Sequence, residues 1–513
     1  MMLFGYDPVR DLPDDHLARL VEAVVEAASL PRTLTGGRGQ PAFDPRLCAK
    51  VLLYGYATGV RSSRQLERLC NESLPYLFLT RGDAPTYRTL CSFRVQQSQL
   101  IEDVWLQLFA VAGECDMKRV GRIVIDSSKF RADAGPEAVV KAKEYDAVLA
   151  ELRQIVKEAD EADARDEEDP PGTTRVGQPV ETEQMRDILR RVRKKLSGRH
   201  KSDGGEPPAT GGEPPAQVKA CAPTECGPRM LPRIKSAIAA LETAKENALK
   251  HICLTDPDAR MMGEGREKGI RECHCFEVVV DAGAGLLVAG QSCQSNTDNS
   301  RLEPLVEAAQ AQEPEGIKSV DADSGYYSGD SLGRLIARGI DTCIPDSNVV
   351  CDLHRGEPLG ATLRRRGYGS VPLEYDAEAD LYRCPQGKRL LPSQRRITRG
   401  QDVTVYRAEA DCTGCTLAAD CLCDATAKRR TVKRGDYRDV LEQARQHFAD
   451  PAHQERYRHR AEVVETVFGF LRSVLGYGRW SLRGKERVAC EARLFKAAYQ
   501  LRKIHGRWSA ETV

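Results

Sequence analysis

Two aspartates far apart in the chain have the residue type and setting of divalent-cation ligands. Asp126 follows the β-branched run at residues 123–125, and Asp323 ends an apolar segment that starts at Ile317. Such runs predict buried strands. A carboxylate at the end of a buried strand is held at the rim of the sheet, where binding sites form. Two of them on neighbouring strands can therefore share a hard cation such as Mg²⁺.

A third acid, Glu465, lies in a predicted helix near the C-terminal end. It borders an apolar stripe, so we expect it to reach the inner edge of the helix. The stripe is formed by Val464, Val467, Phe468, Leu471 and Val474. Arg458 and Arg472 lie seven residues on either side of Glu465 and share its face. Arginines beside a metal-binding acid suit a phosphodiester substrate.

Two of these acids have a competitor, and all three have an ordinary structural interpretation. Asp321 competes with Asp323, and Glu462 competes with Glu465. An aspartate at a strand end is commonly a turn former or a helix cap. Charged residues on a helix commonly form surface ion pairs.

A cysteine cluster predicts a second kind of site. Cys412-x2-Cys415 is followed by Cys421 and preceded by Cys384, with Cys423 as a substitute ligand. This spacing is typical of a structural Zn²⁺ site, and a metal would explain how a segment poor in apolar runs folds. The alternative is reduced, unligated thiols. Two further close groups, Cys221 with Cys226 and residues 273–275 (Cys-His-Cys), each lack a second pair.

The elements that must position these residues predict an α/β chain with a mixed sheet. The predicted core elements run strand, insertion, strand, strand, helix, strand, helix, strand. We expect a helical N-terminal domain over residues 1–115, a core over 116–135 and 253–345, and a cysteine-rich, loop-rich insertion over 346–430. A helical insertion spans 136–252, with a flexible linker at about 158–229 that contains a repeated GGEPPA. Residues 431–513 return to helix.

The charge distribution points to a nucleic-acid partner. The chain carries 76 Lys and Arg against 75 Asp and Glu, but residues 425–513 alone carry 20 against 10. Such asymmetry indicates a basic face. Tyr457, Tyr477 and Trp480 are interleaved with arginines such as Arg483, so they suit either base stacking or a helical core. Five arginines suit a DNA-binding helical bundle or any small helical domain: Arg61, Arg64, Arg68, Arg88 and Arg94.

Several classes of protein are disfavoured. No stretch approaches the roughly 18 apolar residues of a membrane-spanning helix. The first residues do not form a secretory signal, so we expect a cytoplasmic protein. We find no Gly-rich nucleotide loop and no nucleophile–histidine pair, which disfavours a small-molecule enzyme.

Four motifs, in this order, resemble the DDE transposases of bacterial insertion sequences. They are residues 125–129 (Ile-Asp-Ser-Ser-Lys), 256–260 (Asp-Pro-Asp-Ala-Arg), 322–328 (Ala-Asp-Ser-Gly-Tyr-Tyr-Ser) and 465–469 (Glu-Thr-Val-Phe-Gly). The spacing of Tyr457, Arg460, Glu465 and Arg472 is similar to the Tyr–Arg–Glu–Lys signature of the branch with a helical N-terminal transposase domain. Arg replaces Lys here, and the gap between Arg and Glu is one residue longer. Two motifs also depart from the usual Asp-Gly-Thr-Lys and Tyr-Asn-x-Gln, at residues 126–129 and 274–277.

The resemblance implies a ribonuclease H-like fold in which Asp126, Asp323 and Glu465 hold two Mg²⁺ ions. The implied chemistry cuts transposon ends and joins them to target DNA without a covalent protein–DNA intermediate. The implied partner is double-stranded DNA, bound by a nucleoid-associated homodimer. The candidate DNA contacts are Lys129, Tyr457, Arg458, Arg460, Arg472 and Arg483. The alternatives are a nuclease that does not join and a transposase-derived DNA-binding protein.

Overall fold

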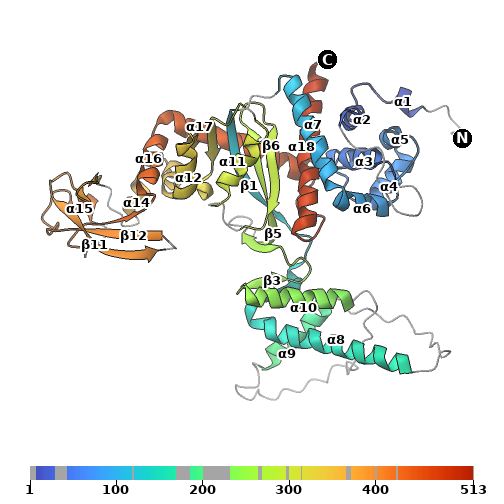
Figure 1. Cartoon of the computed structure of the whole chain (residues 1–513), viewed down its shortest axis with the longest axis horizontal. Coiled ribbons are helices and arrows are strands. Elements are labelled where there is room, and N and C mark those ends of the chain that lie inside the picture. Colours follow the sequence, from blue (N-terminus) through green and yellow to red (C-terminus); the bar gives the residue numbers. More distant parts are fainter. Residues whose placement is uncertain are drawn as a thin grey trace, which may run out of the picture.

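The structure, a computed structural model, has three parts arranged around one central sheet (Figure 1). It describes residues 7–28, 43–117, 121–168, 185–199, 231–263, 269–295, 300–313, 315–365, 371–398, 401–422 and 426–511. The N-terminal helices lie on one side of the sheet and a second sheet lies at the opposite end. A helical insertion projects from a third side. No described helix is both long and apolar enough to cross a membrane.

The central sheet is mixed, as the sequence predicts. Strand β1 (Arg122–Arg131) pairs antiparallel with β5 (Ile270–Asp281) and parallel with β7 (Ser319–Ala322). β7 pairs parallel with β8 (Asp341–Cys343). On its far edge, β5 pairs with both β4 (Arg260–Gly263) and β6 (Leu287–Cys293). The order is therefore β4-β5-β1-β7-β8, with β6 also paired to β5.

The N-terminal part is helical. Its helices are α1 (Pro8–Asp11), α2 (Leu17–Ala27), α3 (Pro45–Ala57), α4 (Ser63–Glu72), α5 (Leu74–Thr80), α6 (Tyr87–Gln96) and α7 (Ser98–Glu114). Local signals set the helix starts: Asp44 accepts the Arg46 N–H at 2.8 Å, and Ser62 accepts the Gln65 N–H at 3.4 Å. The long α18 (Lys485–Glu511) packs against α3 and α7 on one side and β6 on the other. One apolar core therefore runs from these helices into the sheet.

The helical insertion has its own small core. A two-stranded sheet, β2 (Val139–Lys141) with β3 (His251–Cys253), marks its base. Above it lie α8 (Tyr145–Glu168), α9 (Met185–Arg199) and α10 (Leu231–Glu246). The expected linker is wrong at its start, because the acidic run 158–168 continues α8. The GGEPPA repeat, Cys221 and Cys226 lie outside the described residues.

The cysteine-rich region is not loop-rich, which corrects the sequence-based expectation. It holds α13 (Ser347–Arg355), α14 (Ala361–Arg365), α15 (Ala418–Cys421) and a five-stranded antiparallel sheet. The strands are β9 (Glu374–Asp376), β10 (Leu381–Arg383), β11 (Arg389–Thr398), β12 (Gln401–Ala408) and β13 (Thr431–Gly435). Most side chains of β11 are exposed, so the apolar alternation that signals a strand is weak.

Helices α11 (Leu302–Gln310) and α12 (Gly329–Ala337) contact each other beside the central sheet, and α16 (Arg438–Phe448) packs on α12. Helix α11 starts after Arg301 without a side-chain cap. Helix α17 (Pro451–Gly469) crosses β1 and continues into a π-helical turn, Phe470–Val474. The wider π turn shifts the following residues around the helix axis, so Val474 leaves the apolar stripe and is 61% exposed.

Candidate functional site

Asp126 and Asp323 lie side by side where the parallel pairing of β1 with β7 ends. Asp323 lies just past the end of β7, but Asp126 is inside β1, which continues to Arg131, so the expectation that Asp126 ends its strand is wrong. Ile125 of β1 is in register with Ala322 of β7, and the two aspartates are the next residues along each chain. Asp126 accepts the backbone N–H of Ser127 at 2.7 Å. Asp323 accepts that of Gly325 at 2.9 Å and so caps the short 3-10 helix Ser324–Tyr326. Both carboxylates are thus fixed at the same rim of the sheet.

The electrostatics of this rim disfavour ionisation of Asp126. Burial raises its pKa to about 6; the nearby charge of Arg460 opposes this shift, and that of Asp323 adds to it. The Arg460 guanidinium lies 3.0 Å from the Asp126 carboxylate and is itself only 12% exposed. The rim therefore holds two close carboxylates and one arginine, an arrangement that favours an additional cation.

Asp321, the competitor of Asp323, is occupied by ion pairs. Its carboxylate is fully buried and accepts from Arg122 at 2.6 and 2.8 Å and from Arg456 at 2.6 Å. Its side chain points into the structure, whereas Asp323 lies just past the strand end. On accessibility, Asp323 is the better ligand candidate.

Glu465 is not on the inner edge of its helix, contrary to expectation. It is exposed on α17, and no hydrogen bond or ion pair involves it within the described residues. The competitor Glu462 is also exposed and pairs with His459 at 3.2 Å. Glu465 shares α17 with Arg460, which contacts Asp126. The structure thus brings Asp126 and Asp323 together and leaves the Glu465 side chain exposed on α17.

Several candidate DNA contacts make internal bonds instead. Arg483 donates to the backbone and side chain of Asp133 at 2.8 and 2.9 Å. Arg458 pairs with Glu455 at 2.6 Å. Arg472 donates to Ser128 at 2.8 Å and to the Lys129 carbonyl at 2.7 Å, which joins the end of α17 to β1.

The candidate aromatic residues belong to the core. Tyr477 and Trp480 are fully buried and stack on Phe495, with ring centroids 4.6 and 4.9 Å away. Tyr457 packs on Phe448, with centroids 5.5 Å apart, and lies beneath the Arg460 guanidinium. These rings are therefore core residues rather than surfaces on which bases stack.

The N-terminal arginines divide into two groups. Arg61 and Arg94 are structural: Arg61 is bonded to Glu491, and Arg94, at 7% exposure, is bonded to Tyr56. Arg64, Arg68 and Arg88 are exposed. Only this second group keeps the exposure that phosphate contacts need.

The four candidate zinc ligands surround one small cavity. Cys384, Cys412, Cys415 and Cys421 all line a space of about 20 Å³. The Cys415 sulfur accepts the Leu417 N–H at 3.5 Å, and Gly387, with φ +72°, closes a tight turn after Cys384. The donor set suits Zn²⁺, although no three of the four sulfurs lie within 4.8 Å of one another. Cys423 lies outside the described residues.

Residues 256–260 and 273–275 have structural roles. Buried Asp256 bonds the His274 ring at 2.9 Å and the Gly484 N–H at 3.1 Å, which fastens the start of α18 to β5. Buried Glu277, also on β5, accepts twice from Arg301 at 2.8 and 2.9 Å. The sequence shows both motifs, but it does not reveal which residues they bond.

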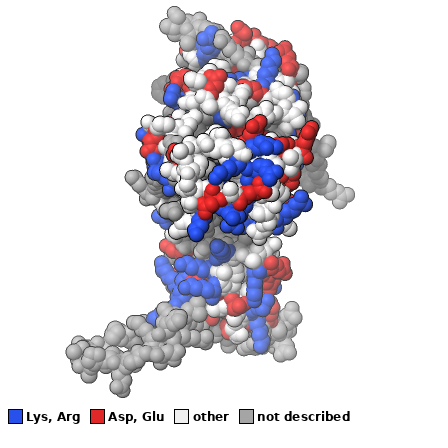
Figure 2. Space-filling view, turned by 90° about the vertical axis from the view of Figure 1, so that its left-hand side faces the viewer, with Lys and Arg blue, Asp and Glu red and all other residues white. Residues whose placement is uncertain are grey.

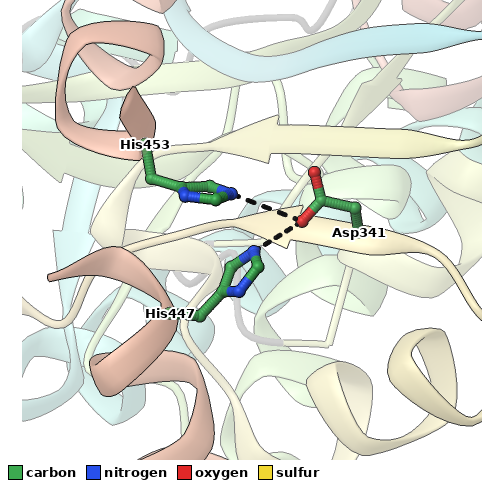
Figure 3. Close-up of side chains that lie close together, drawn as sticks. All are labelled: Asp341, His447 and His453. Atoms are coloured by element: carbon green, nitrogen blue, oxygen red, sulfur yellow. Dashed lines mark hydrogen bonds and ion pairs between the residues drawn. The ribbon is translucent and has the colours of Figure 1, made fainter. Parts of the chain in front are cut away.

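The structure contains one cluster of metal-ligand residue types that the sequence did not predict. Asp341, His447 and His453 are the single trio of His, Cys, Asp or Glu in the described residues whose ligand atoms all lie within 4.8 Å of one another (Figure 3). The two histidines flank the turn between α16 and α17. The Asp450-Pro451 helix start between them is the feature of the sequence that indicates this turn. Nothing local in the sequence points to Asp341.

Comparison with known families agrees with this architecture. Residues 383–505 match the family described as Transposase DDE domain, and residues 8–96 match that described as Transposase domain (DUF772). No curated protein matches the chain. The two matches support an insertion-sequence DDE transposase. Glu465 and the four cysteines lie within the first match, whereas Asp126 and Asp323 lie outside both.

Proposed function

We propose that this transposase cleaves the ends of its element and joins them to target DNA at the rim that carries Asp126 and Asp323. The observation that carries the proposal is the fixed pair of carboxylates on adjacent parallel strands, with α17 alongside. The match to the DDE domain supports transposition as the biological process.

The strand order supports a ribonuclease H-like core. In β6-β5-β1-β7-β8, the first three strands are antiparallel neighbours and β1, β7 and β8 are parallel. In open sheets of this kind, sites form beyond the carboxyl ends of the parallel strands. Asp323 lies just past such an end, and Asp126 lies beside it within β1, where the pairing with β7 stops.

The donor set fits hard divalent cations such as Mg²⁺. Asp126 and Asp323 provide carboxylate oxygens from a rigid rim. Glu465 has an exposed carboxylate without a bonded partner among the described residues, so it is available as a third ligand. When bound, two such ions supply activation of the attacking hydroxyl and stabilisation of the leaving 3′-oxygen. The same site then serves cleavage by water and joining by the freed 3′-hydroxyl.

Arg460 acts as a positioning residue in this proposal. It neutralises Asp126 and packs over the Tyr457 ring, so it fixes both the carboxylate and the angle of α17. Lys129 and Arg472, where α17 meets β1 beyond Asp126, are the proposed phosphate contacts next to the acids. Arg458 and Arg483 are proposed as weaker contacts, because carboxylates already pair with them.

The proposed assembly is a homodimer that holds two DNA ends together. The proposed zinc ion at Cys384, Cys412, Cys415 and Cys421 stabilises the five-stranded sheet, whose apolar core is small.

Cleavage and joining of a labelled duplex with the element's own ends, in Mg²⁺, test the proposal. We expect Asp323→Asn and Glu465→Gln each to lower both rates by more than about 100-fold, with DNA binding retained. Glu462→Gln is the matched control, because it removes an exposed acid from the same helix. Full activity of Asp323→Asn would overturn the assignment.

One observation favours a transposase-derived DNA-binding protein instead. Glu465 is exposed on α17 without a bonded partner among the described residues, and Arg460 already pairs with Asp126. Binding of the ends without cleavage by the unaltered protein would establish this second function. A nuclease without joining activity would cleave the duplex but leave precut ends unjoined.

A further inference from the structure

The trio of Asp341, His447 and His453 forms a compact set of nitrogen and oxygen donors away from the acid rim. Asp341 is on edge strand β8, His447 is in the last turn of α16, and His453 is in the first turn of α17. Figure 3 shows both imidazole rings directed at the same carboxylate. Three elements therefore converge on one point.

The distances suit coordination of a single ion. His447 Nε2 lies 2.7 Å and His453 Nε2 lies 3.7 Å from the same oxygen, Asp341 Oδ1. Donors at about 2.0–2.1 Å from a tetrahedral Zn²⁺ stand roughly 3.3 Å apart, which these two separations bracket. Shifts of less than about 1 Å would complete the geometry.

The two imidazoles are in close contact, and one of them is only partly satisfied. Their ring centroids are 3.9 Å apart. His453 Nδ1 is buried without a hydrogen-bond partner, and the nearest carboxylate, Asp450 Oδ2, lies 3.9 Å away. A proton on Nδ1 facing Asp450 leaves the Nε2 lone pair directed at Asp341. A carboxylate behind the imidazole is the usual second partner of a metal-bound histidine.

Asp341 uses its two oxygens for different partners. Oδ2 bonds Arg456, which in turn bonds buried Asp321, so the carboxylate is held in place. Oδ1 faces the histidines. Asp341 is 36% exposed and His447 is 42% exposed, so an ion and a water ligand can enter from solvent.

We propose that Asp341, His447 and His453 bind one first-row transition-metal ion, with Zn²⁺ as the expected occupant. Two imidazoles and one carboxylate suit Zn²⁺ and its neighbours, whereas Mg²⁺ prefers oxygen donors alone. The site is thus chemically distinct from the acid rim. It ties β8, α16 and the start of α17 together, and α17 carries Arg456, Arg460 and Glu465.

Metal content of the full-length protein tests this proposal. Protein treated with chelator is incubated with Zn²⁺, passed through gel filtration and assayed for bound zinc. We expect His447→Gln to bind one equivalent less than the unaltered protein. His459→Gln is the matched control, because His459 is exposed on α17 and pairs only with surface glutamates. Equal zinc content of His447→Gln and the unaltered protein would overturn the proposal.

Cobalt spectra separate this site from the cysteine cluster. Cys412→Ser with Cys415→Ser removes thiolate ligands, so the remaining Co²⁺ should show ligand-field bands without sulfur charge-transfer bands. We expect those bands to disappear when His447→Gln is added, and to persist when His459→Gln is added instead. Because His447 is 42% exposed, its replacement should leave the fold intact. Co²⁺ bands unchanged by His447→Gln would also overturn the proposal, whatever the DNA cleavage activity.

Discussion

At the scale of single residues, the rim depends on the contrast between Asp126 and Asp321. Both are strand aspartates with arginine partners. Asp321 has two such partners and no solvent access, whereas Asp126 has one and shares its surroundings with Asp323. The first is buried and paired with two arginines. The second keeps a raised pKa of about 6 until a cation arrives.

The pKa of Asp126 predicts a pH-dependent requirement for Mg²⁺. The folded-state pKa is raised from 3.8 to about 6, so protonation competes with the cation as the pH falls through 6. We expect the Mg²⁺ concentration for half-maximal cleavage to rise steeply between pH 7 and pH 5, and to change little above pH 7. Initial rates across Mg²⁺ titrations at each pH measure this. A requirement that is constant down to pH 5 would contradict the prediction.

The same pKa has an opposite consequence for the metal-free fold. A carboxyl group whose pKa is raised on folding binds its proton more tightly in the folded state. Its ionisation therefore costs stability as the pH rises from about 4 through 6. Mg²⁺ should relieve this cost, so the cation should raise the melting temperature more at pH 7.5 than at pH 5.

Asp321→Asn should destabilise the protein far more than Asp323→Asn. It leaves the charges of Arg122 and Arg456 without their buried partner, which costs about 3 kcal/mol or more. Asp323→Asn keeps an acceptor at a short cap and should cost under about 1 kcal/mol. Urea unfolding of both variants measures the difference. Similar losses would mean that Asp321 is not the structural member of the pair.

At the scale of elements, α17 and α18 position most of the site. Helix α17 follows β1 from the Arg122 end to Lys129, with Arg456, Arg460 and Arg472 as successive contacts. The π turn and the loop after it then direct the chain into α18. Buried Glu491 on α18 accepts the N–H groups of Ser481 and Leu482 at 2.8 and 3.0 Å and also pairs with Arg61. One carboxylate thus joins the loop to the N-terminal helices.

Glu491→Ala should therefore loosen the junction between the N-terminal helices and the sheet. It leaves two N–H groups without their buried acceptor and removes the ion pair of Arg61, which keeps its bond to the Arg479 carbonyl, at a cost of about 3 kcal/mol. Urea unfolding and proteolysis near residue 60 measure the effect. Glu486→Ala, an exposed position on the same helix, should change stability by less than about 1 kcal/mol. Equal stability of the two variants would contradict the role of Glu491.

At the scale of the whole molecule, much of the basic C-terminal segment is neutralised inside the fold. Its arginines and lysines meet acids from earlier parts of the chain: Glu102, Asp126, Asp133, Asp321, Asp341 and Asp346. At the end of the molecule that carries the five-stranded sheet, basic and acidic side chains are intermingled (Figure 2). The charge asymmetry of the sequence therefore overstates the positive electrostatic potential that DNA would meet at the surface.

Asp133→Asn should increase DNA affinity. It removes the acid that pairs with Arg479 and Arg483, whose side chains are 60% and 51% exposed. We expect binding several-fold tighter and a slope of log affinity against log salt steeper by about 1–2. Glu242→Gln makes the same charge change in the helical insertion, where its partner is Arg153. A larger effect of Glu242→Gln would place the DNA elsewhere.

The sequence alone determined the class of fold, the position of Asp323 at a strand end and the transposase resemblance, but it ended β1 too early at Asp126. These rest on local signals: β-branched runs, helix caps such as Asp44 and Ser62, and motifs within a few residues. The sequence did not reveal the exposed β11, because a polar strand lacks apolar alternation. It also did not reveal that Glu465 is exposed, because packing against β1 decides which face of α17 is buried.

Only the tertiary structure decided which charges meet. Arg460 and Asp126 are 334 residues apart in the sequence, and Asp341 is 106 residues from His447. Ion pairs and candidate metal ligands at such separations depend on strand order and helix packing rather than on any local pattern. The sequence could therefore nominate Asp126 and Asp323 separately, whereas the histidine cluster existed only once β8, α16 and α17 had been brought together.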